Sequence, residues 1–126
     1  MPSRNFKGMD LERKASNYYS TLGWSTQQRW HFRDGREIDV YGTKLDYLTG
    51  KSYLLVECKN TARVSRADVE YFAKKVLNFA QSLTRASPFG GSPAIYAVIV
   101  HSGDVSAELE SWAAGLDPPI QFRFMD

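Results

Sequence analysis

The chain is predicted to form a single α/β domain, an α/β/α sandwich in which helices flank a central mixed sheet. Short alternating segments joined by tight-turn residues indicate an antiparallel meander. A long amphipathic helix between two strand-like segments indicates a parallel crossover. The length of 126 residues suits one continuous hydrophobic core, so residues 1–126 are expected to be one domain. The elements below are taken in chain order.

Residues 1–8 are expected to form a flexible basic arm, and a helix is expected to begin near Asp10. Apolar residues then recur at helical spacing, and Gly23 supplies a stop signal. The helix dipole favours an acidic residue such as Glu12 in the first turn, whether or not that residue has a function. The apolar positions are Leu11, Ala15, Tyr18, Tyr19 and Leu22.

Three strands are expected to follow as an antiparallel meander. Ser25 to Arg33 alternates weakly, and the tight-turn signal Asp34-Gly35 leads into a second strand from Arg36 to Thr43. A second turn signal at Thr49-Gly50 precedes the third strand, Lys51 to Lys59.

A long helix and a buried strand come next. Ser65 is a suitable helix cap, because an acidic residue follows three positions later and an apolar stripe begins there. Residues 84–93 are expected to be a loop, and Ala94 to His101 is a continuous apolar run typical of an interior strand. That strand is expected to run parallel to residues 51–59. The stripe contains Val69, Phe72, Ala73, Val76, Phe79, Ala80 and Leu83.

A final helix is expected from Asp104 to Leu116, ended by Pro118-Pro119, with a short edge strand from Ile120 to Phe124. Its inward positions are Val105, Leu109, Trp112, Ala113 and Leu116.

Composition and charge narrow the classes of function. The single cysteine, Cys58, has no partner for an intramolecular disulfide and is expected to pack as a small apolar residue. The longest apolar run is too short to cross a bilayer, and no signal peptide is recognisable, so we expect a cytoplasmic protein without a membrane partner. The net charge of +2 hides two basic blocks, residues 1–36 and 59–85, on either side of the acidic residues 37–58. Such blocks suit phosphate contacts, although solvated helix faces give the same pattern.

The third strand carries the charges that suggest chemistry. Side chains alternate along a strand, so Glu57 and Lys59 share a face with Leu55 and are expected where the strand leaves the core. A ligand can approach a carboxylate and an ammonium placed at such a rim. The opposite face has Leu54, Val56 and Cys58. In the second strand the same alternation places Ile38 and Val40 on one face and Glu37, Asp39 and Tyr41 on the other.

If these two strands are neighbours, Asp39 lies close to Glu57. Two nearby carboxylates repel and raise a pKa unless a cation lies between them. Mg²⁺ prefers carboxylate oxygens and keeps several waters. Lys59 is then placed to bind the attacking water or to balance charge as a phosphodiester is hydrolysed. If the first helix packs across the sheet, Glu12 becomes a further ligand, directly or through water.

These residues resemble the PD-(D/E)XK signature of the restriction-endonuclease-like superfamily. The resemblance is carried by Glu37-Ile38-Asp39-Val40 and Leu55-Val56-Glu57-Cys58-Lys59, with Ile38 where the family has proline. The segment Lys7 to Ala15 resembles the opening of Holliday-junction resolvases and Mrr-type restriction endonucleases. The resemblance extends from about Asn5 to His101.

The resemblance implies a restriction-endonuclease-like fold and a nuclease dependent on Mg²⁺ or Mn²⁺. Asp39 and Glu57 would bind the metal, Lys59 would assist the nucleophile, and Glu12 would be an auxiliary acid. The products would carry a 5′-phosphate. Many members are homodimers, and a chain this small covers little DNA, which agrees with a homodimer or with one domain of a larger assembly.

Basic residues near the predicted site are candidates for contacts with duplex or branched DNA. The candidates are Arg63 and Arg66 after the third strand, Arg29 and Arg33 on or near the first hairpin, and Lys7 in the N-terminal arm. Lys74 and Lys75 on the long helix leave the same two alternatives open: phosphate contacts or an ordinary exposed surface.

Other chemistries lack their residues. No Ser or Cys has the context of a nucleophile elbow for His31 or His101, Gly90-Gly91 lacks the spacing of a phosphate loop, and there is no Cys/His cluster for zinc. Two interpretations remain. One is a metal-dependent DNA endonuclease, either junction-resolving or restriction-like. The other is a catalytically silent nucleic-acid-binding or assembly module with the same fold. DNA specificity, and RNA as a substrate, stay open.

Overall fold

The computed structural model describes the backbone of residues 3–48, 50–86 and 93–126, with side chains described from Met9 onward. The elements are α1 (Ser3–Thr21), β1 (Ser25–His31), β2 (Glu37–Asp46), β3 (Gly50–Lys59), α2 (Arg66–Ala86), β4 (Ala94–His101), α3 (Ala107–Ala114) and β5 (Ile120–Phe124). Among these residues no helix is long and apolar enough to span a bilayer.

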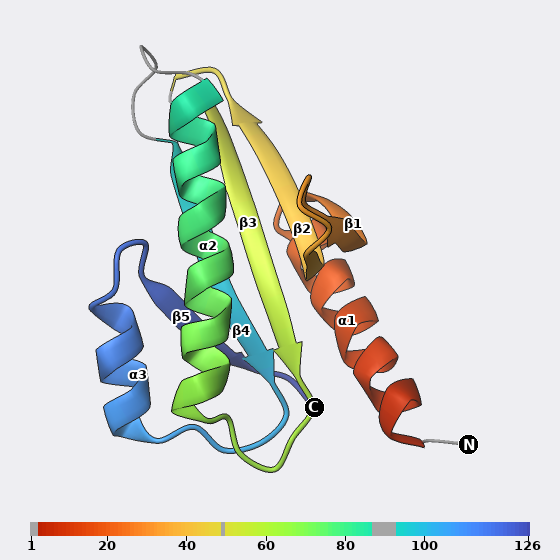
Figure 1. Cartoon of the computed structure of the whole chain (residues 1–126). Coiled ribbons are helices and arrows are strands. Elements are labelled where there is room, and N and C mark those ends of the chain that lie inside the picture. The colour runs from red at the N-terminus through yellow and green to blue at the C-terminus, as the bar shows by residue number, and fades with distance from the viewer. Residues whose placement is uncertain (1–2, 49, 87–92) are drawn as a thin grey trace.

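The five described strands form one mixed sheet in the order β1-β2-β3-β4-β5. The first three pair antiparallel, β4 runs parallel to β3, and β5 runs parallel to β4 at the edge. Helix α1 covers one face, and α2 and α3 cover the other (Figure 1). The predicted α/β/α sandwich, its meander and its crossover strand are confirmed.

The sheet separates two hydrophobic cores, and β3 and β4 contribute to both. This explains why their sequences are nearly continuous apolar runs. The α1-side core contains Leu11, Ala15, Tyr19, Val40, Leu54, Val56, Val98 and Val100. The α2-side core contains Ile38, Leu55, Val64, Val69, Phe72, Val76, Phe79, Ala97, Ile99, Leu109, Ala113 and Ile120.

The alternation expected for β2 is wrong at Asp39. Ile38 packs in the α2-side core and Val40 in the α1-side core, although they are two positions apart. Regular pairing of β2 with β3 stops at Val40 opposite Val56. Beyond that point the Cys58 N–H donates to the Asp39 carboxylate, with 2.7 Å between Cys58 N and Asp39 Oδ2. The side chain satisfies a donor that the ladder leaves unpaired, so β2 can diverge from β3 here.

Several element ends differ from the sequence expectation. Helix α1 begins at Ser3 rather than near Asp10, so the expected flexible arm is helical from Ser3 onward. Leu22 was expected in the apolar stripe but is 50% exposed, because the helix has ended before it. Helix α2 continues to Ala86, into the expected loop. Residues 87–92 of that loop and Thr49 of the second expected turn lie outside the described residues.

Helix α3 begins at Ala107 rather than at Asp104, because the Asp104 backbone is bonded to the loop after β3. Asp104 N–H donates to the Ala62 carbonyl, and Val64 N–H donates to the Asp104 carbonyl, each at 2.9 Å. Gly103 allows this approach, since a Cβ there would lie 2.0 Å from a backbone oxygen of the same loop. The starts of α2 and α3 are therefore held side by side beyond the carboxyl ends of β3 and β4.

Candidate active site

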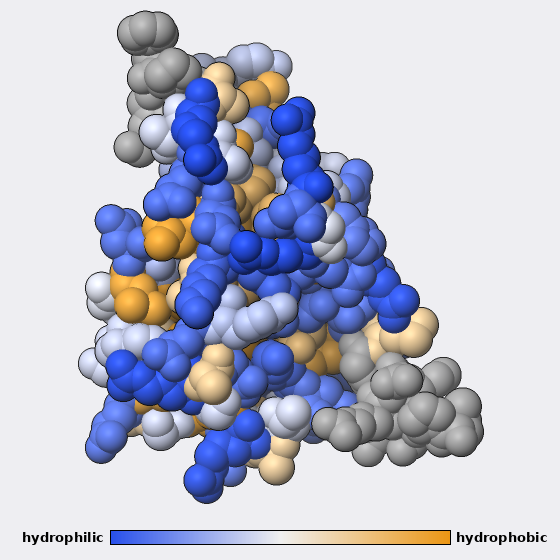
Figure 2. Space-filling view, in the orientation of Figure 1, coloured by the Kyte–Doolittle hydropathy of each residue, from blue (hydrophilic) through white to orange (hydrophobic). Residues whose placement is uncertain are grey.

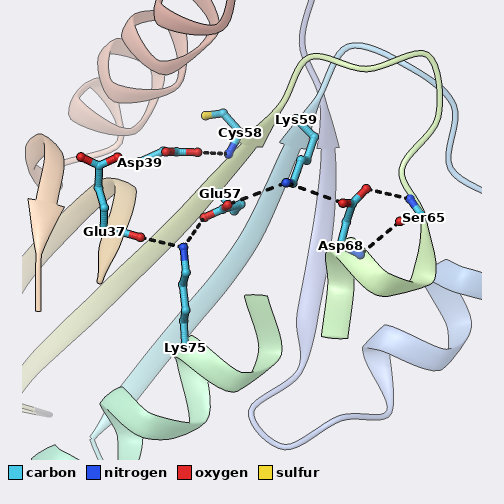
Figure 3. A network of polar contacts seen from close by, with 8 residues as sticks. All are labelled: Glu37, Asp39, Glu57, Cys58, Lys59, Ser65, Asp68 and Lys75. Carbon is cyan, nitrogen blue, oxygen red and sulfur yellow. Dashed lines mark hydrogen bonds and ion pairs between the residues drawn. The ribbon is translucent and has the colours of Figure 1, made fainter. Parts of the chain in front are cut away.

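Charged side chains gather where β3 ends, and Glu57 lies at their centre (Figure 3). Glu57 was expected at an exposed rim, but it is buried, with 8% of its surface exposed. Its Oε1 has no hydrogen-bond partner among the described residues. The nearest cations are Lys75, 3.6 Å from Oε1 to Nζ, and Lys59, 4.0 Å from Oε2 to Nζ. A buried carboxylate oxygen without a hydrogen bond is rare in a native fold and suits a ligand position.

Lys75 is the main site residue whose position the sequence left undecided. It is 7% exposed, and its Nζ donates to the Glu37 carbonyl oxygen at 2.7 Å. The sequence did contain a signal. Lys75 lies between Phe72 and Phe79 within the apolar stripe of α2, where a lysine is buried only if it has partners.

Asp39 approaches the same place from β2. Burial raises the pKa of Asp39, and the negative charge of Glu37 adds to this. The hydrogen bond from Cys58 N–H and the ammonium groups of Lys75 and Lys59 oppose the rise. One carboxylate oxygen is thus fixed by the backbone of β3, which holds the side chain in a single orientation.

Glu57 and Asp39 are close enough to affect each other's ionisation. Burial raises the pKa of Glu57 to about 7, and the negative charge of Asp39 is the next cause. The two lysines act in the opposite direction without cancelling these effects. Near neutral pH the surrounding positive charge is therefore not enough to keep both carboxylates fully ionised.

Glu12 reaches the site from the other face of the sheet. Its Oε2 accepts a hydrogen bond from Arg29 Nε at 3.4 Å. Burial raises the pKa of Glu12, the charge of Asp39 raises it further, and Arg29 opposes both. Arg29 itself has φ of 53°, an unusual backbone conformation for a residue other than glycine. The charge of Asp39 therefore acts on two glutamates: Glu12 on the α1 side of the sheet and Glu57 on the α2 side.

Lys59 links Glu57 to the beginning of α2. Its Nζ is 3.7 Å from Asp68 Oδ1, and its side chain is 24% exposed. Asp68 Oδ2 accepts from Ser65 N–H at 2.9 Å, and Ser65 Oγ accepts from Asp68 N–H at 3.1 Å. This reciprocal capping box fixes the acid that faces Lys59. Cys58 packs against the α1-side core, and burial raises the pKa of its thiol, which disfavours the thiolate that a nucleophile needs.

A hard divalent cation fits the donor chemistry of this site. Asp39 and Glu57 offer carboxylate oxygens, and the unbonded Glu57 Oε1 is the position most in need of a partner. Among residues 9–48, 50–86 and 93–126, however, no three His, Cys, Asp or Glu side chains converge into a metal-binding group. The arrangement therefore fits two protein carboxylates with water completing the shell, as is common for Mg²⁺, with Glu12 further out.

The predicted DNA-binding residues lie in different surroundings. Arg63 and Arg66 line a hollow between the starts of α2 and α3, where the Arg66 guanidinium lies 4.0 Å from the centre of the Trp112 ring. Arg33 lines a cavity beside the β1–β2 turn, and Arg29 is paired with Glu12. The Lys7 side chain lies outside the described residues. Their roles stay predictions.

The fold is similar to a solved structure, the crystal structure of a repair endonuclease from Pyrococcus abyssi. The two superpose with a TM-score of 0.51 and 16% sequence identity, over 82% of this chain and 38% of that chain. The fold is restriction-endonuclease-like. At this identity the likeness shows the fold alone, and the chain spans well under half the length of that structure. No protein-family model and no curated protein sequence matches the chain.

Proposed function

We propose that this chain is a metal-dependent endonuclease that hydrolyses phosphodiester bonds in DNA. One observation carries the proposal: half-buried Asp39 and buried Glu57, on adjacent strands, both have raised pKa values, while a Glu57 oxygen has no hydrogen bond among the described residues. Raised carboxylate pKa values of this kind are typical of sites that bind a cation or transfer a proton. The name of the Pyrococcus protein, a repair endonuclease, agrees with this activity.

In this proposal Asp39 and Glu57 would hold Mg²⁺ or Mn²⁺, and Glu12 would be a further ligand, directly or through water. The ion would lower the pKa of a water and neutralise charge on the phosphate. It would also return both carboxylates to their charged state, which removes the electrostatic cost of placing them together.

The chain's own residues have distinct tasks. Lys59, partly exposed at the end of β3, donates a hydrogen bond to the attacking water or to a phosphate oxygen. Lys75 orients Glu57 from α2, because a hydrogen bond to the Glu37 carbonyl oxygen fixes the position of its Nζ. Cys58 N–H orients Asp39. Lys75 and the Cys58 amide are positioning groups, whereas Lys59 touches the reacting atoms.

A cleavage assay tests the proposal on supercoiled, linear and four-way-junction DNA, with Mg²⁺ compared with EDTA. We expect cleavage only with the metal, and a loss of about a hundredfold or more in Asp39→Asn, Glu57→Gln and Lys59→Ala. Glu37→Gln is the matched control, because its carboxylate is 45% exposed and its one ion pair among the described residues is with His31, at 3.5 Å. Activity that survives both Asp39→Ala and Lys59→Ala would refute the site. The choice of DNA cleaved separates junction-resolving from restriction-like action.

A homodimer would place two such sites on two strands. Light scattering of the chain with and without four-way-junction DNA measures this directly, and a monomer in both conditions would contradict it.

The alternative, a catalytically silent nucleic-acid-binding module, is favoured by one observation. Lys75 already places an ammonium 3.6 Å from Glu57, and an ammonium can replace a metal as the counter-charge. This alternative predicts DNA binding that Mg²⁺ does not alter, and no heat of Mn²⁺ binding in titration calorimetry. Heat that disappears in Glu57→Gln would exclude it.

A further inference from the structure

A cavity of about 590 Å³ lies between the β1–β2 turn and the second half of α2. In Figure 2 apolar side chains, coloured tan and orange, are visible there between hydrophilic side chains, coloured blue. The volume is within the range of small-molecule and cofactor sites. The proposed nuclease site does not use this cavity, although Lys75 borders both.

The wall of the cavity is aromatic. Trp30 and Phe32 are half-buried and meet edge to face, with ring centroids 5.0 Å apart and planes at 83°. Phe79 closes the wall from α2, with its centroid 5.8 Å from Phe32 and 6.2 Å from Trp30. Tyr41 stacks on Trp30 with ring centroids 4.0 Å apart, which restrains the Trp30 ring. The wall therefore presents ring surface that is fixed before any ligand arrives.

The rim of the cavity is basic. Arg33 and Arg85 line it, and neither makes an ion pair within the described part of the chain. Arg36 is held by Asp34, with 3.0 Å from Nε to Oδ2, so one arginine of the rim is already compensated. An aromatic wall beneath two uncompensated guanidinium groups is complementary to a ligand with a flat ring and an anionic group.

The cavity is joined to the proposed active site along α2. Lys75 lies at one end of the cavity, 3.6 Å from Glu57, and Ser82 lies two turns further along the same side of the helix. At a rise of 1.5 Å per residue this separation is about 10 Å. That is roughly the length of three nucleotides along one strand of B-form DNA.

We propose that this cavity holds one unpaired nucleotide of the nucleic-acid substrate, with its base against Phe32 and Trp30 and its phosphate at Arg33 and Arg85. The inference rests on the proposed function and names the substrate class: DNA with a single-stranded or branched segment beside the cleaved bond. A base inside a duplex is stacked on both faces and cannot enter a concave aromatic site. Aromatic walls bind any base, so the site reads strand structure rather than sequence.

Binding to a labelled oligothymidylate and to a duplex of equal length, both in EDTA so that cleavage does not interfere, tests the cavity. Ser82→Glu places a carboxylate on the lining of the cavity, and Gln81→Glu places the same charge on the neighbouring position of α2, which does not line it. Among the described residues the Ser82 side chain makes one hydrogen bond, to the Phe79 carbonyl of its own helix, so its loss should not unfold the chain. Thermal unfolding of both variants verifies this.

We expect Ser82→Glu to weaken oligothymidylate binding by roughly tenfold or more, the effect of losing one stacked base, and Gln81→Glu to leave it within about twofold. Both variants should affect duplex binding equally. The double variant Arg33→Ala, Arg85→Ala should repeat the selective loss. Equal effects of the two glutamates on the single strand would overturn the proposal. So would AMP binding that Ser82→Glu abolishes while oligothymidylate binding persists, because the cavity would then serve a free nucleotide.

The outcomes also separate this inference from the proposed function. Metal-dependent cleavage of duplex DNA with no selective effect of Ser82→Glu would refute the cavity and leave the nuclease. Selective single-strand binding without any cleavage would refute the nuclease and leave the cavity as the binding site of a silent module.

Discussion

Glu57 and Asp68 share one cation and yet have opposite ionisation behaviour. Lys59 Nζ is 4.0 Å from Glu57 and 3.7 Å from Asp68. The pKa of Glu57 is raised to about 7, whereas that of Asp68 is lowered. Burial acts upward on both pKa values, but at Asp68 the Ser65 N–H hydrogen bond and the Lys59 charge outweigh it. Glu57 is more deeply buried, and its Oε1 has no such donor.

The difference between Asp68 and Glu57 shows that hydrogen-bond donors decide the ionisation of a carboxylate at this site. A nearby lysine is common to both residues, so it does not decide the outcome. A backbone N–H commits Asp68 to the start of α2, where its charge is part of the fold. Among the described residues no backbone N–H reaches the inner oxygen of Glu57, so a bound cation would stabilise its charge further.

The largest expected effect is the pH dependence that Glu57 gives to folding stability. Its pKa is about 7 in the folded chain and 4.5 ordinarily, so its contribution is fully present below 4.5 and is lost as the pH rises through 7. By about pH 8 the loss is about 3 kcal/mol. Urea unfolding of Glu57→Gln should show a smaller decline over this window. If the unfolding free energies of the two proteins change with pH in parallel, the pKa of Glu57 is not raised.

Adding Mn²⁺ near pH 8 should reverse that loss. At a concentration about 100 times the dissociation constant, an ion bound only by the folded chain stabilises it by about 2.7 kcal/mol. The melting temperature of the wild type should rise, and those of Asp39→Asn and Glu57→Gln should change little. A rise of equal size in all three would place the ion elsewhere.

Removing the deeper cation is expected to have an intermediate effect. Lys75→Met should destabilise the chain by roughly 2 kcal/mol near pH 8, because the Glu37 carbonyl loses its donor and Glu57 must become protonated. The cost should fall near pH 5, where Glu57 is already protonated. Chemical unfolding at both pH values measures this, and adding Glu57→Gln should recover part of the loss. A cost that does not depend on pH would separate Lys75 from Glu57.

The smallest effect belongs to Asp68. Asp68→Ala should cost about 1 kcal/mol, the value of a helix cap. The pKa of Asp68 is lowered, so its stabilisation is present above its ordinary value of 3.8 and disappears only as the pH falls through the lowered pKa. The loss should therefore be the same at about pH 5 and about pH 8. Asp10→Ala, which breaks exposed pairs with Arg13 and Lys14, is the control and should leave stability unchanged.

Most of the fold was predictable because local signals agreed with one another. The turn residues around Asp34-Gly35 and the apolar run of Ala94 to His101 each indicated one element, and chain order indicated the parallel crossover. The approach of Asp39 to Glu57 followed from placing the two strands as neighbours. These predictions concern the order and type of the helices and strands, which sequence patterns indicate well.

The burial of the site residues, and their contacts with residues distant in the sequence, were not predictable. Alternation gives the face of Glu57 but not its burial, which depends on how α2 packs over it. The role of Lys75 depends on the rotation of that helix against Glu37, and the position of Arg66 over Trp112 depends on how α2 and α3 dock. The change of face at Asp39 arises from a side-chain hydrogen bond that replaces strand pairing, which no periodic pattern contains.

That hydrogen bond ties the proposed catalytic acid to the sheet in a way that would constrain how this protein can evolve. Alanine at position 39 would remove the proposed metal ligand and also leave the Cys58 amide without its side-chain acceptor. Asparagine would retain the acceptor and lose only the charge. If the proposed cleavage is right, a descendant that abandons it but keeps its shape is expected to carry asparagine there. Drift to a small apolar residue should be accompanied by loosening of the strand junction.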